Sequence, residues 1–402
     1  MRIRSTGLTL FMGLSIMVAA CSSGASTAPS TAATTAPTAA GSTEPASSGS
    51  AGPSPAASVV QKPSLKIGVV TDIGTLDDKN YNEYTDKGVL AAASALGAPV
   101  PPAVVPKDAS EYATLIQAYV DQKFEMIVTV GFNLAAATGA AAVKNKDIQF
   151  IGIDQSPICL TPDGKADFTF PCPNDPKTVA PNYVSIEFQE DQAGYLAGII
   201  AASVSKSGTI GAIGGTTLCA PCVRYIQGYA LGAQSVNPSI VVKTAYVTSD
   251  FSNAAFNDPV GGKKFAQSFI TTNKVDVLFQ VAGKTGNGVL DAACAANIYG
   301  VGVDVDQAIS YPNAAACIVT SAEKHLQVAT GQVIEQLAAG QKLAGDVLFD
   351  AKTNGIGASP GHDLASLITP DIQSKVDAAM AAMVAGTLKT CPDTGCGVYT
   401  KP

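Results

Sequence analysis

The sequence predicts an α/β protein whose parallel sheets are covered by helices on both faces. Apolar runs of strand length alternate with helix-like stretches along the chain, which is typical of such sheets. The body, from residue 64 to residue 402, is rich in glycine and apolar residues and poor in charge. Its length is sufficient for two domains, so we expect a doubly wound architecture that is divided into two parts.

The strands and helices are predicted from these runs in chain order. The first strand, at 66–70, reads Lys-Ile-Gly-Val-Val, and a helical segment at 79–96 follows it. A strand at 183–188 leads into a helix at 189–204 that is rich in alanine and glycine. Further strands are predicted at 126–130, 150–153, 209–213, 275–279 and 299–303.

The N-terminus has the features of a secretory signal at residues 1–20. Arg2 and Arg4 precede an apolar run that is short for a membrane span. The run ends in Val-Ala-Ala before Cys21, which resembles a bacterial lipobox and implies a diacylglycerol group on the Cys21 thiol. The alternative is a plain signal peptide followed by a chance cysteine. The lipobox interpretation places the protein at the cell membrane, lipid-anchored on the extracytoplasmic face.

Residues 21–63 are predicted to form a disordered tether. From Ser22 to Pro63 the chain consists almost entirely of Ser, Thr, Ala, Pro and Gly, and Glu44 and Lys62 are its only charged residues. Such a segment buries too little apolar surface to offset its chain entropy. As a flexible chain it would hold the folded body roughly 35 Å from the point of attachment.

The charge balance argues against polyanionic partners. The formal net charge is −7, and Arg224 is the only arginine outside the predicted signal. A nucleic-acid-binding protein would carry basic clusters, which this sequence lacks. Phosphate-rich ligands are also disfavoured, because bidentate arginine clamps are missing.

Eight cysteines remain when Cys21 carries lipid, and an even number in an oxidising compartment indicates disulfides. Sequence alone does not prove their connectivity. Proximity along the chain favours Cys159 with Cys172, Cys219 with Cys222, Cys294 with Cys317, and Cys391 with Cys396.

The Cys219-Ala-Pro-Cys222 segment has two interpretations. A Cys-x-Pro-Cys sequence before a helix resembles a thioredoxin-type redox site, in which a helix N-terminus stabilises the thiolate. The alternative is a structural disulfide in a turn. The surrounding α/β pattern is much larger than a thioredoxin unit, which favours the structural interpretation.

Polar residues recur at the predicted carboxyl ends of the strands. Asp72, Asp154 and Asp304 each follow such a strand, and Asn133 and Gly283 lie just beyond two others. Ligands of parallel sheets bind beyond these strand ends. A carboxylate there can accept hydrogen bonds from two sugar hydroxyls. Each residue alone could equally be a helix N-cap, but their recurrence favours a ligand site.

Several segments resemble the basic membrane protein family, whose members are lipoproteins that bind purine nucleosides for ABC transporters. The similarity runs in order through nearly the whole body. It is carried by Asp-Ile-Gly-Thr-Leu-Asp-Asp-Lys-Asn-Tyr-Asn at 72–82, and by segments at 183–198, 208–215, 279–288, 302–307 and 320–324.

This resemblance implies a type I periplasmic-binding-protein fold, in which two α/β lobes joined by a hinge hold ligand between them. Lobe 1 is expected at 64–182, with 320–345 returning to it. Lobe 2 is expected at 183–319, with 346–402 mostly packing on it. Lobe closure would bury the ligand and create the surface that an ABC permease recognises, and the expected state is a monomer.

The resemblance also assigns the contacts to a purine base. Tyr81 matches a stacking position, and Phe256 is favoured over Phe251 as the second stacking ring. Asn82 and Asp154 would form hydrogen bonds with the edge of the base. An insert between Cys159 and Cys172 departs from the family pattern and lies soon after Asp154, where it could alter the ligand.

Four further residues complete the site that the resemblance implies. Asp72 would line the cleft from the first lobe, and Asp304 would accept hydrogen bonds from the ribose hydroxyls. Gly283 would allow close approach of the backbone, and Lys324 would approach the ribose.

The sequence argues against catalysis and implies no cofactor or metal. A Gly-Lys-Thr sequence at 283–285 ends like a phosphate-binding loop, but the leading glycine of that motif is missing. His325 and His362 are the only histidines, which leaves little for a metal site or a triad. The predicted function is capture of a purine nucleoside for uptake. The alternatives are another small polar ligand, such as a sugar or a signalling furanose, and a thiol-redox lipoprotein.

Overall fold

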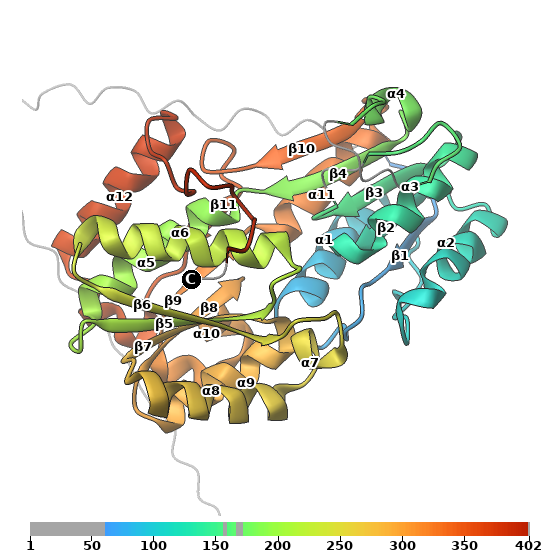
Figure 1. Cartoon of the computed structure of the whole chain (residues 1–402). Coiled ribbons are helices and arrows are strands. Elements are labelled where there is room, and N and C mark those ends of the chain that lie inside the picture. Colours follow the sequence, from blue (N-terminus) through green and yellow to red (C-terminus); the bar gives the residue numbers. More distant parts are fainter. Residues whose placement is uncertain (1–60, 156–158, 166–171, 401–402) are drawn as a thin grey trace, which may run out of the picture. The chain divides into compact units, whose positions relative to one another are not determined.

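The computed structural model describes residues 61–155, 159–165 and 172–400 (Figure 1). The predicted signal peptide, Cys21 and the tether as far as residue 60 lie outside these residues. The tether was predicted to extend to residue 63, yet Gln61 and Lys62 already contact the body. The side-chain nitrogen of Gln61 donates to the Ala95 carbonyl oxygen at 2.8 Å, and the backbone nitrogen of Lys62 donates to that of Leu96 at 2.7 Å. Among the described residues, no helix combines the length and the apolar character that crossing a membrane requires.

Two sheets form the framework of the described chain. In the first, five strands are all parallel and follow the order β1-β2-β3-β4-β10. In the second, six strands follow the order β11-β9-β8-β7-β5-β6, and only β11 is antiparallel to its neighbour. The strands are β1 (Ile67–Val70), β2 (Met126–Val130), β3 (Gln149–Ile153), β4 (Tyr183–Phe188), β5 (Thr209–Thr216), β6 (Val241–Thr248), β7 (Val277–Val281), β8 (Tyr299–Asp304), β9 (Ile318–Lys324), β10 (Gly345–Phe349) and β11 (Ile356–Ala358).

Helices cover both faces of each sheet, as the continuous apolar strands predict (Figure 1). In the first sheet α1 and α11 pack on one face and α2 and α3 on the other, and in the second sheet α5, α6 and α12 lie opposite α8 and α9. These helices are α1 (Tyr81–Leu96), α2 (Tyr112–Asp121), α3 (Ala135–Lys144), α5 (Glu190–Val204), α6 (Ala220–Val236), α8 (Pro259–Asn273), α9 (Gly283–Ala295), α11 (Leu326–Ala338) and α12 (Pro370–Val384). Single turns of helix are α4 (Pro176–Val179), α7 (Asn253–Phe256) and α10 (Gln307–Ser310), with 3₁₀ turns at Ala109–Glu111, Phe132–Leu134, Pro312–Cys317 and His362–Leu367.

The main hydrophobic core is continuous between the two sheets. Buried residues of α1, such as Val89, and of α5, such as Leu196, belong to the same cluster. The chain passes between the sheets after β4, after β9 and after β10. Several crossings of this kind agree with the hinge that the resemblance implies.

The sheet membership of three strands differs from the predicted lobe boundaries. The prediction started the second lobe at residue 183, but β4 pairs with β3 in the first sheet. The prediction returned 320–345 to the first lobe, where α11 does pack on α1, but β9 pairs with β8 in the second sheet. It assigned most of 346–402 to the second lobe, where β11 and α12 do pack, but β10 pairs with β4 in the first sheet. The predicted boundaries were misplaced because an apolar pattern shows where a strand lies but not which sheet it joins.

Helices α5 and α6 pack unusually closely because glycines face each other across their contact. A Cβ atom added at Gly194 or Gly198 would lie well under 3.0 Å from a carbonyl oxygen of α6. The same holds for Gly228 and Gly232 against carbonyl oxygens of α5. Only glycine permits this approach of the two backbones, so the pair forms a rigid support beside the ends of the strands.

Candidate functional site

A cavity with about 660 Å³ of empty space, part of it open to solvent, lies at the carboxyl ends of the strands of both sheets. The cavity is lined by all eight residues predicted to contact ligand: Asp72, Tyr81, Asn82, Asp154, Phe256, Gly283, Asp304 and Lys324. Residues that the sequence analysis did not assign to ligand contact also line it, namely Ile73, Gly74, Asp78, Phe132, Cys219, Pro221, Cys222, Tyr225, Val281 and Val303.

The start of α1 positions Tyr81 and Asn82. The buried carboxylate of Asp78 accepts hydrogen bonds from the backbone nitrogens of Asn80, Asn82 and Glu83, at 2.9, 2.7 and 3.2 Å. It therefore satisfies nitrogens that the first turn of a helix leaves without partners. The hydroxyl of Tyr81 then donates to the Ile153 carbonyl oxygen at 3.2 Å, which ties the ring to the end of β3.

The two central aspartates occupy equivalent places in the two sheets. Asp154 follows β3 and Asp304 ends β8, and both have left-handed backbones, with φ of 57° and 66°. Aspartate adopts this conformation more readily than most residues, yet it is uncommon and is often found at functional sites. Gly131 and Gly283, which follow the neighbouring strands, also have positive φ. The Asp72 side chain lies against Gly131, where a Cβ atom would collide with it.

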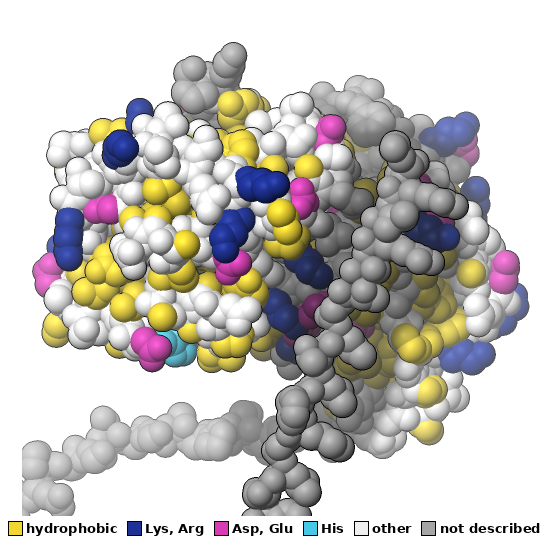
Figure 2. All heavy atoms as spheres, turned by 90° about the horizontal axis from the view of Figure 1, so that it is seen from below, with side chains coloured by type: hydrophobic (Ala, Val, Ile, Leu, Met, Phe, Trp, Pro, Cys, Tyr) yellow, Lys and Arg dark blue, Asp and Glu magenta, His cyan; other side chains and the backbone are white. Residues whose placement is uncertain are grey.

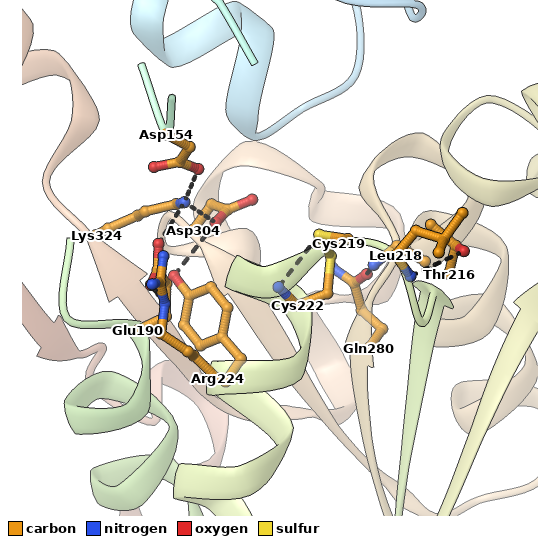
Figure 3. Close-up of a disulfide and its surroundings, with 12 residues drawn as sticks. Asp154, Glu190, Thr216, Leu218, Cys219, Cys222, Arg224, Gln280, Asp304 and Lys324 are labelled. Carbon is orange, nitrogen blue, oxygen red and sulfur yellow. Dashed lines mark hydrogen bonds and ion pairs between the residues drawn. A yellow bond between two sulfur atoms is a disulfide. The ribbon is translucent and has the colours of Figure 1, made fainter. Parts of the chain in front are cut away.

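A buried ion-pair cluster centres on Lys324, which is 2% exposed (Figure 3). Its ammonium lies 2.5 Å from Asp154 Oδ2, 3.3 Å from Glu190 Oε1 and 3.8 Å from Asp304 Oδ1. It also lies 5.0 Å from the centroid of the Tyr81 ring. Burial lowers the pKa of Lys324, but the three carboxylates outweigh this effect and raise it above its ordinary value. The cation therefore links Asp154, beyond the first sheet, to Asp304 in the second.

Helix α6 adds two side chains to this cluster. Arg224 Nε donates to Glu190 Oε2 at 2.7 Å, and the Tyr225 hydroxyl donates to Asp304 Oδ1 at 3.2 Å. Burial and the Asp304 carboxylate raise the pKa of Tyr225 well above its ordinary value, so its hydroxyl remains a donor. The sequence prediction missed Tyr225; the signal available was its position three residues after Cys222, on one face of a helix.

Two buried acceptor atoms that belong to the lining have no hydrogen-bond partner. These are Asn82 Oδ1 and Asp154 Oδ1. A buried oxygen without a partner carries a desolvation penalty of about 1–3 kcal/mol. A ligand that offers N–H or O–H groups at these two positions would remove that penalty.

The acid–base behaviour of Asp304 makes stability depend on pH. Burial raises its pKa from 3.8 to about 7, although Lys324 acts in the opposite direction. The folded state therefore holds this proton more tightly than the unfolded state does, and stability falls as pH rises from about 4 to about 7. We expect the urea concentration at the unfolding midpoint to fall as pH rises through this range. In Asp304→Asn this pH dependence should be smaller, because asparagine still accepts a hydrogen bond from Tyr225 but does not titrate. An unchanged pH profile in the variant would contradict the assignment.

Residues of the two lobes also contact each other directly. Asn287 Nδ2 donates to the Asp78 carbonyl oxygen at 3.0 Å, and Ser310 Oγ donates to that of Lys79 at 2.6 Å. The rings of Phe132 and Phe251 pack with their centroids 5.1 Å apart.

The two candidate stacking rings are thereby distinguished by position. Phe256 lines the cavity, whereas Phe251 is not among its lining residues and packs on Phe132. A stacking role for Phe256 stays a prediction.

The four disulfides predicted from proximity are all present: Cys159–Cys172, Cys219–Cys222, Cys294–Cys317 and Cys391–Cys396. The insert between the first two cysteines lies partly outside the described residues. Of the four, only Cys219–Cys222 contributes to the cavity lining of the described chain.

The surface of the described body carries mixed charge. On the face seen in Figure 2, lysine and arginine side chains are spread among acidic, hydrophobic and uncharged ones. This distribution is not that of a nucleic-acid-binding face, which gathers basic side chains into one patch.

Two solved structures with the same architecture are ABC transporter solute-binding proteins. An ABC transporter solute-binding protein from Aeropyrum pernix K1 superposes with a TM-score of 0.67 at 21% identity, covering 81% of this chain and 92% of that chain. Another, from Conexibacter woesei DSM 14684, gives 0.60 at 20% identity, with coverages of 81% and 98%. These likenesses confirm the predicted type I periplasmic-binding-protein fold.

Curated relatives share the sequence pattern over much of the body. The chain is 29% identical over 257 residues to the ABC transporter nucleoside-binding protein BmpA of Lactococcus lactis subsp. cremoris, covering 61% of this chain and 65% of that protein. It is 28% identical over 262 residues to Basic membrane protein A of Borreliella burgdorferi, covering 64% and 68%. The matches thus span about two thirds of the length of these relatives.

A family model described as ABC transporter substrate-binding protein PnrA-like matches residues 65–384, which is most of the chain and includes both sheets. The predicted resemblance is therefore confirmed at the level of the family. The chain belongs to the PnrA-like, or Bmp, family of ABC transporter substrate-binding proteins.

Proposed function

We propose that the protein captures a purine nucleoside between its two lobes and delivers it to an ABC permease, while lipid on Cys21 holds it at the membrane. The observation that carries this proposal is the meeting of all eight predicted contact residues, from both sheets, around one cavity. The printed name of the Lactococcus relative, a nucleoside-binding protein, supports the same ligand class. Members of this family bind substrates for transporters and are not enzymes, in agreement with the sequence prediction.

The chemistry of the cavity suits a ligand with an aromatic and a hydroxylated part. Tyr81, Phe132 and Phe256 supply aromatic faces that a purine can stack on. The carboxylates of Asp154 and Asp304 can accept hydrogen bonds from N–H and O–H groups. No cofactor or metal is needed for this mode of binding.

The proposal is tested by a thermal-shift panel on a soluble body that begins before Gln61, because Gln61 and Lys62 contact α1. The panel contains inosine, guanosine, adenosine, the free bases, ribose and hexoses. A ligand that binds only the native state stabilises it by about 2.7 kcal/mol at about a hundred times its dissociation constant. We expect a shift with at least one nucleoside and none with ribose or free base.

Calorimetry on protein refolded from denaturant, which removes co-purified ligand, is the control for the panel. A response to a sugar but to no nucleoside would overturn the nucleoside proposal. It would move the function to another small polar solute, and the Cys159–Cys172 insert would be the first segment to study.

Tyr81→Ala is expected to weaken nucleoside binding by roughly 1–3 kcal/mol, by analogy with base–aromatic stacking. The measurement is the dissociation constant from calorimetry. Tyr81→Phe is the matched control, because it keeps the ring and loses only the hydroxyl that donates to the Ile153 carbonyl oxygen. If Tyr81→Ala bound as tightly as the parent, the ring would have no stacking role.

The membrane anchor is tested separately from ligand binding. We expect the parent protein to partition with the membrane fraction and Cys21→Ala to be released into the soluble extracytoplasmic fraction. Equal partitioning of the two would contradict lipid attachment at Cys21.

A further inference from the structure

The Cys219–Cys222 disulfide lies in the wall of the cavity. Both cysteines are buried, at 3% and 6% exposure, and both line the cavity together with Pro221. Figure 3 shows the disulfide close to the charged cluster of Lys324 and Asp304.

The disulfide also forms the start of α6. Cys219 is the N-cap residue, and its sulfur accepts a hydrogen bond from the backbone nitrogen of Cys222 at 3.2 Å. Sulfur is a weak acceptor, so serine or aspartate would cap this helix better. The choice of cysteine here is therefore not explained by helix capping.

The same helix turn carries the contacts that organise the charged cluster. Tyr225 follows Cys222 by three residues, so the two side chains share a face of α6 and both line the cavity. Tyr225 donates to Asp304, and Arg224 beside it donates to Glu190. The close glycine packing on α5 leaves α6 little freedom to shift, so the disulfide is held at a fixed place in the wall.

We propose that the Cys219–Cys222 disulfide is a ligand-contacting, specificity-determining part of the binding site, and that full affinity requires its oxidised form. This inference rests on the proposed nucleoside-binding function. Cys219 and Cys222 belong to the cavity lining, and their bonded sulfurs form a compact, polarisable, apolar group. Sulfur makes favourable contacts with aromatic rings such as that of a purine. Reduction replaces this surface by two thiols that are free to separate.

The redox step needs a dithiol reductant, such as dithiothreitol. One of its thiolates attacks a cysteine sulfur, which forms a mixed disulfide and displaces the other cysteine as a thiolate. The second thiolate of the reductant then attacks the mixed disulfide, which closes the ring and releases the first cysteine as a thiolate. The protein gains two electrons and two protons as Cys219 and Cys222 thiols, and the reductant becomes a cyclic disulfide. A ligand seated against the disulfide blocks this attack, and by linkage a ligand that prefers the oxidised form makes reduction less favourable.

The first experiment measures protection of the disulfide by inosine in the full-length protein. Dithiothreitol is added with and without saturating inosine, free thiols are alkylated at intervals, and each cysteine pair is quantified by mass spectrometry. We expect inosine to slow reduction of Cys219–Cys222 severalfold. The Cys391–Cys396 pair is the internal control, because Cys396 is exposed and neither cysteine lines the cavity, so its rate should not change. Equal slowing of both pairs, or of neither, overturns the inference.

The second experiment separates ligand contact from helix capping. The double variant C219S with C222A keeps a capping oxygen but loses the disulfide, whereas C219A with C222A loses both. We expect both double variants to bind inosine roughly three- to tenfold more weakly than the parent. Only C219A with C222A should also be less stable, because it lacks the side-chain cap of α6. C391A with C396A should bind as the parent does.

The outcomes distinguish this inference from the function on which it rests. Tight inosine binding by the parent, with equal affinity in the C219S and C222A variant, overturns the role of the disulfide and leaves nucleoside capture standing. Absence of any nucleoside binding by the parent overturns both.

Discussion

Lys324→Met is expected to lower the free energy of unfolding by about 3–5 kcal/mol, because it removes one partner of a buried ion-pair cluster. The substitution leaves the buried carboxylates of Asp154, Glu190 and Asp304 without their shared cation. Methionine fills much of the volume of the lysine stem, so the loss reports on charge rather than on a cavity. The measurement is urea unfolding followed by circular dichroism.

The pH dependence of this loss provides its own check. Without the cation, Asp154 and Asp304 lower the cost of burial by taking up protons, so the deficit of the variant should shrink as pH falls. The matched control is Lys375→Met, which removes an exposed pair with Asp371 and should cost about 0–1 kcal/mol. If the two variants lost the same free energy of unfolding at every pH, Lys324 would not be a cation that stabilises buried carboxylates.

Gly228→Ala is expected to destabilise the fold by about 3 kcal/mol. Overpacking costs about 1–3 kcal/mol, and the upper end applies here because the added Cβ meets backbone atoms, which cannot rotate away as a side chain can. The added Cβ would meet the Asp191 carbonyl oxygen of α5 at a separation that real Cβ atoms do not show. The two helices must move apart, which displaces Glu190 at the start of α5 and Tyr225 on α6. We therefore expect a lower unfolding midpoint in urea together with weaker nucleoside binding.

Gly331→Ala is the matched control for this substitution. Gly331 is a buried glycine in the interior of α11, and an added Cβ there finds its nearest atom at an ordinary 3.6 Å. Alanine favours a helix over glycine by about 1 kcal/mol, so this variant should be as stable as the parent or more stable. A similar loss of stability in both variants would contradict the explanation that Gly228 is required for close packing of the two helices.

Several strands could be predicted because their pattern is simple. β2 and β7 are mostly apolar and are buried along their whole length. Both lie where the sequence places a strand to within two residues. β6 was missed because it is an edge strand with mostly half-exposed residues. β9 was missed because it reads as polar, yet Thr320, Ser321 and Lys324 are buried. Their polar groups have hydrogen-bond or ion-pair partners, which a pattern of hydrophobicity does not reveal.

The candidate site was predictable where chemistry and strand position coincide. Asp72, Asp154 and Asp304 follow strands, and parallel strands bring their carboxyl ends to one edge of a sheet. Tyr225 could not be found in this way, because it reaches the cavity from a helix. The pairing of Lys324 with Asp154, at the ends of strands in different sheets, depends on how the two sheets sit against each other.

The interleaving of the two sheets along the chain has a consequence for how the molecule is made. Residues 345–349 supply β10, so the edge of β4 that β10 covers stays unpaired until most of the chain has been synthesised. An open strand edge is a template for association with other chains. Truncation before residue 345 should therefore yield aggregates rather than a half-folded lobe, and the intact body, with one core running through both sheets, should unfold in a single cooperative step.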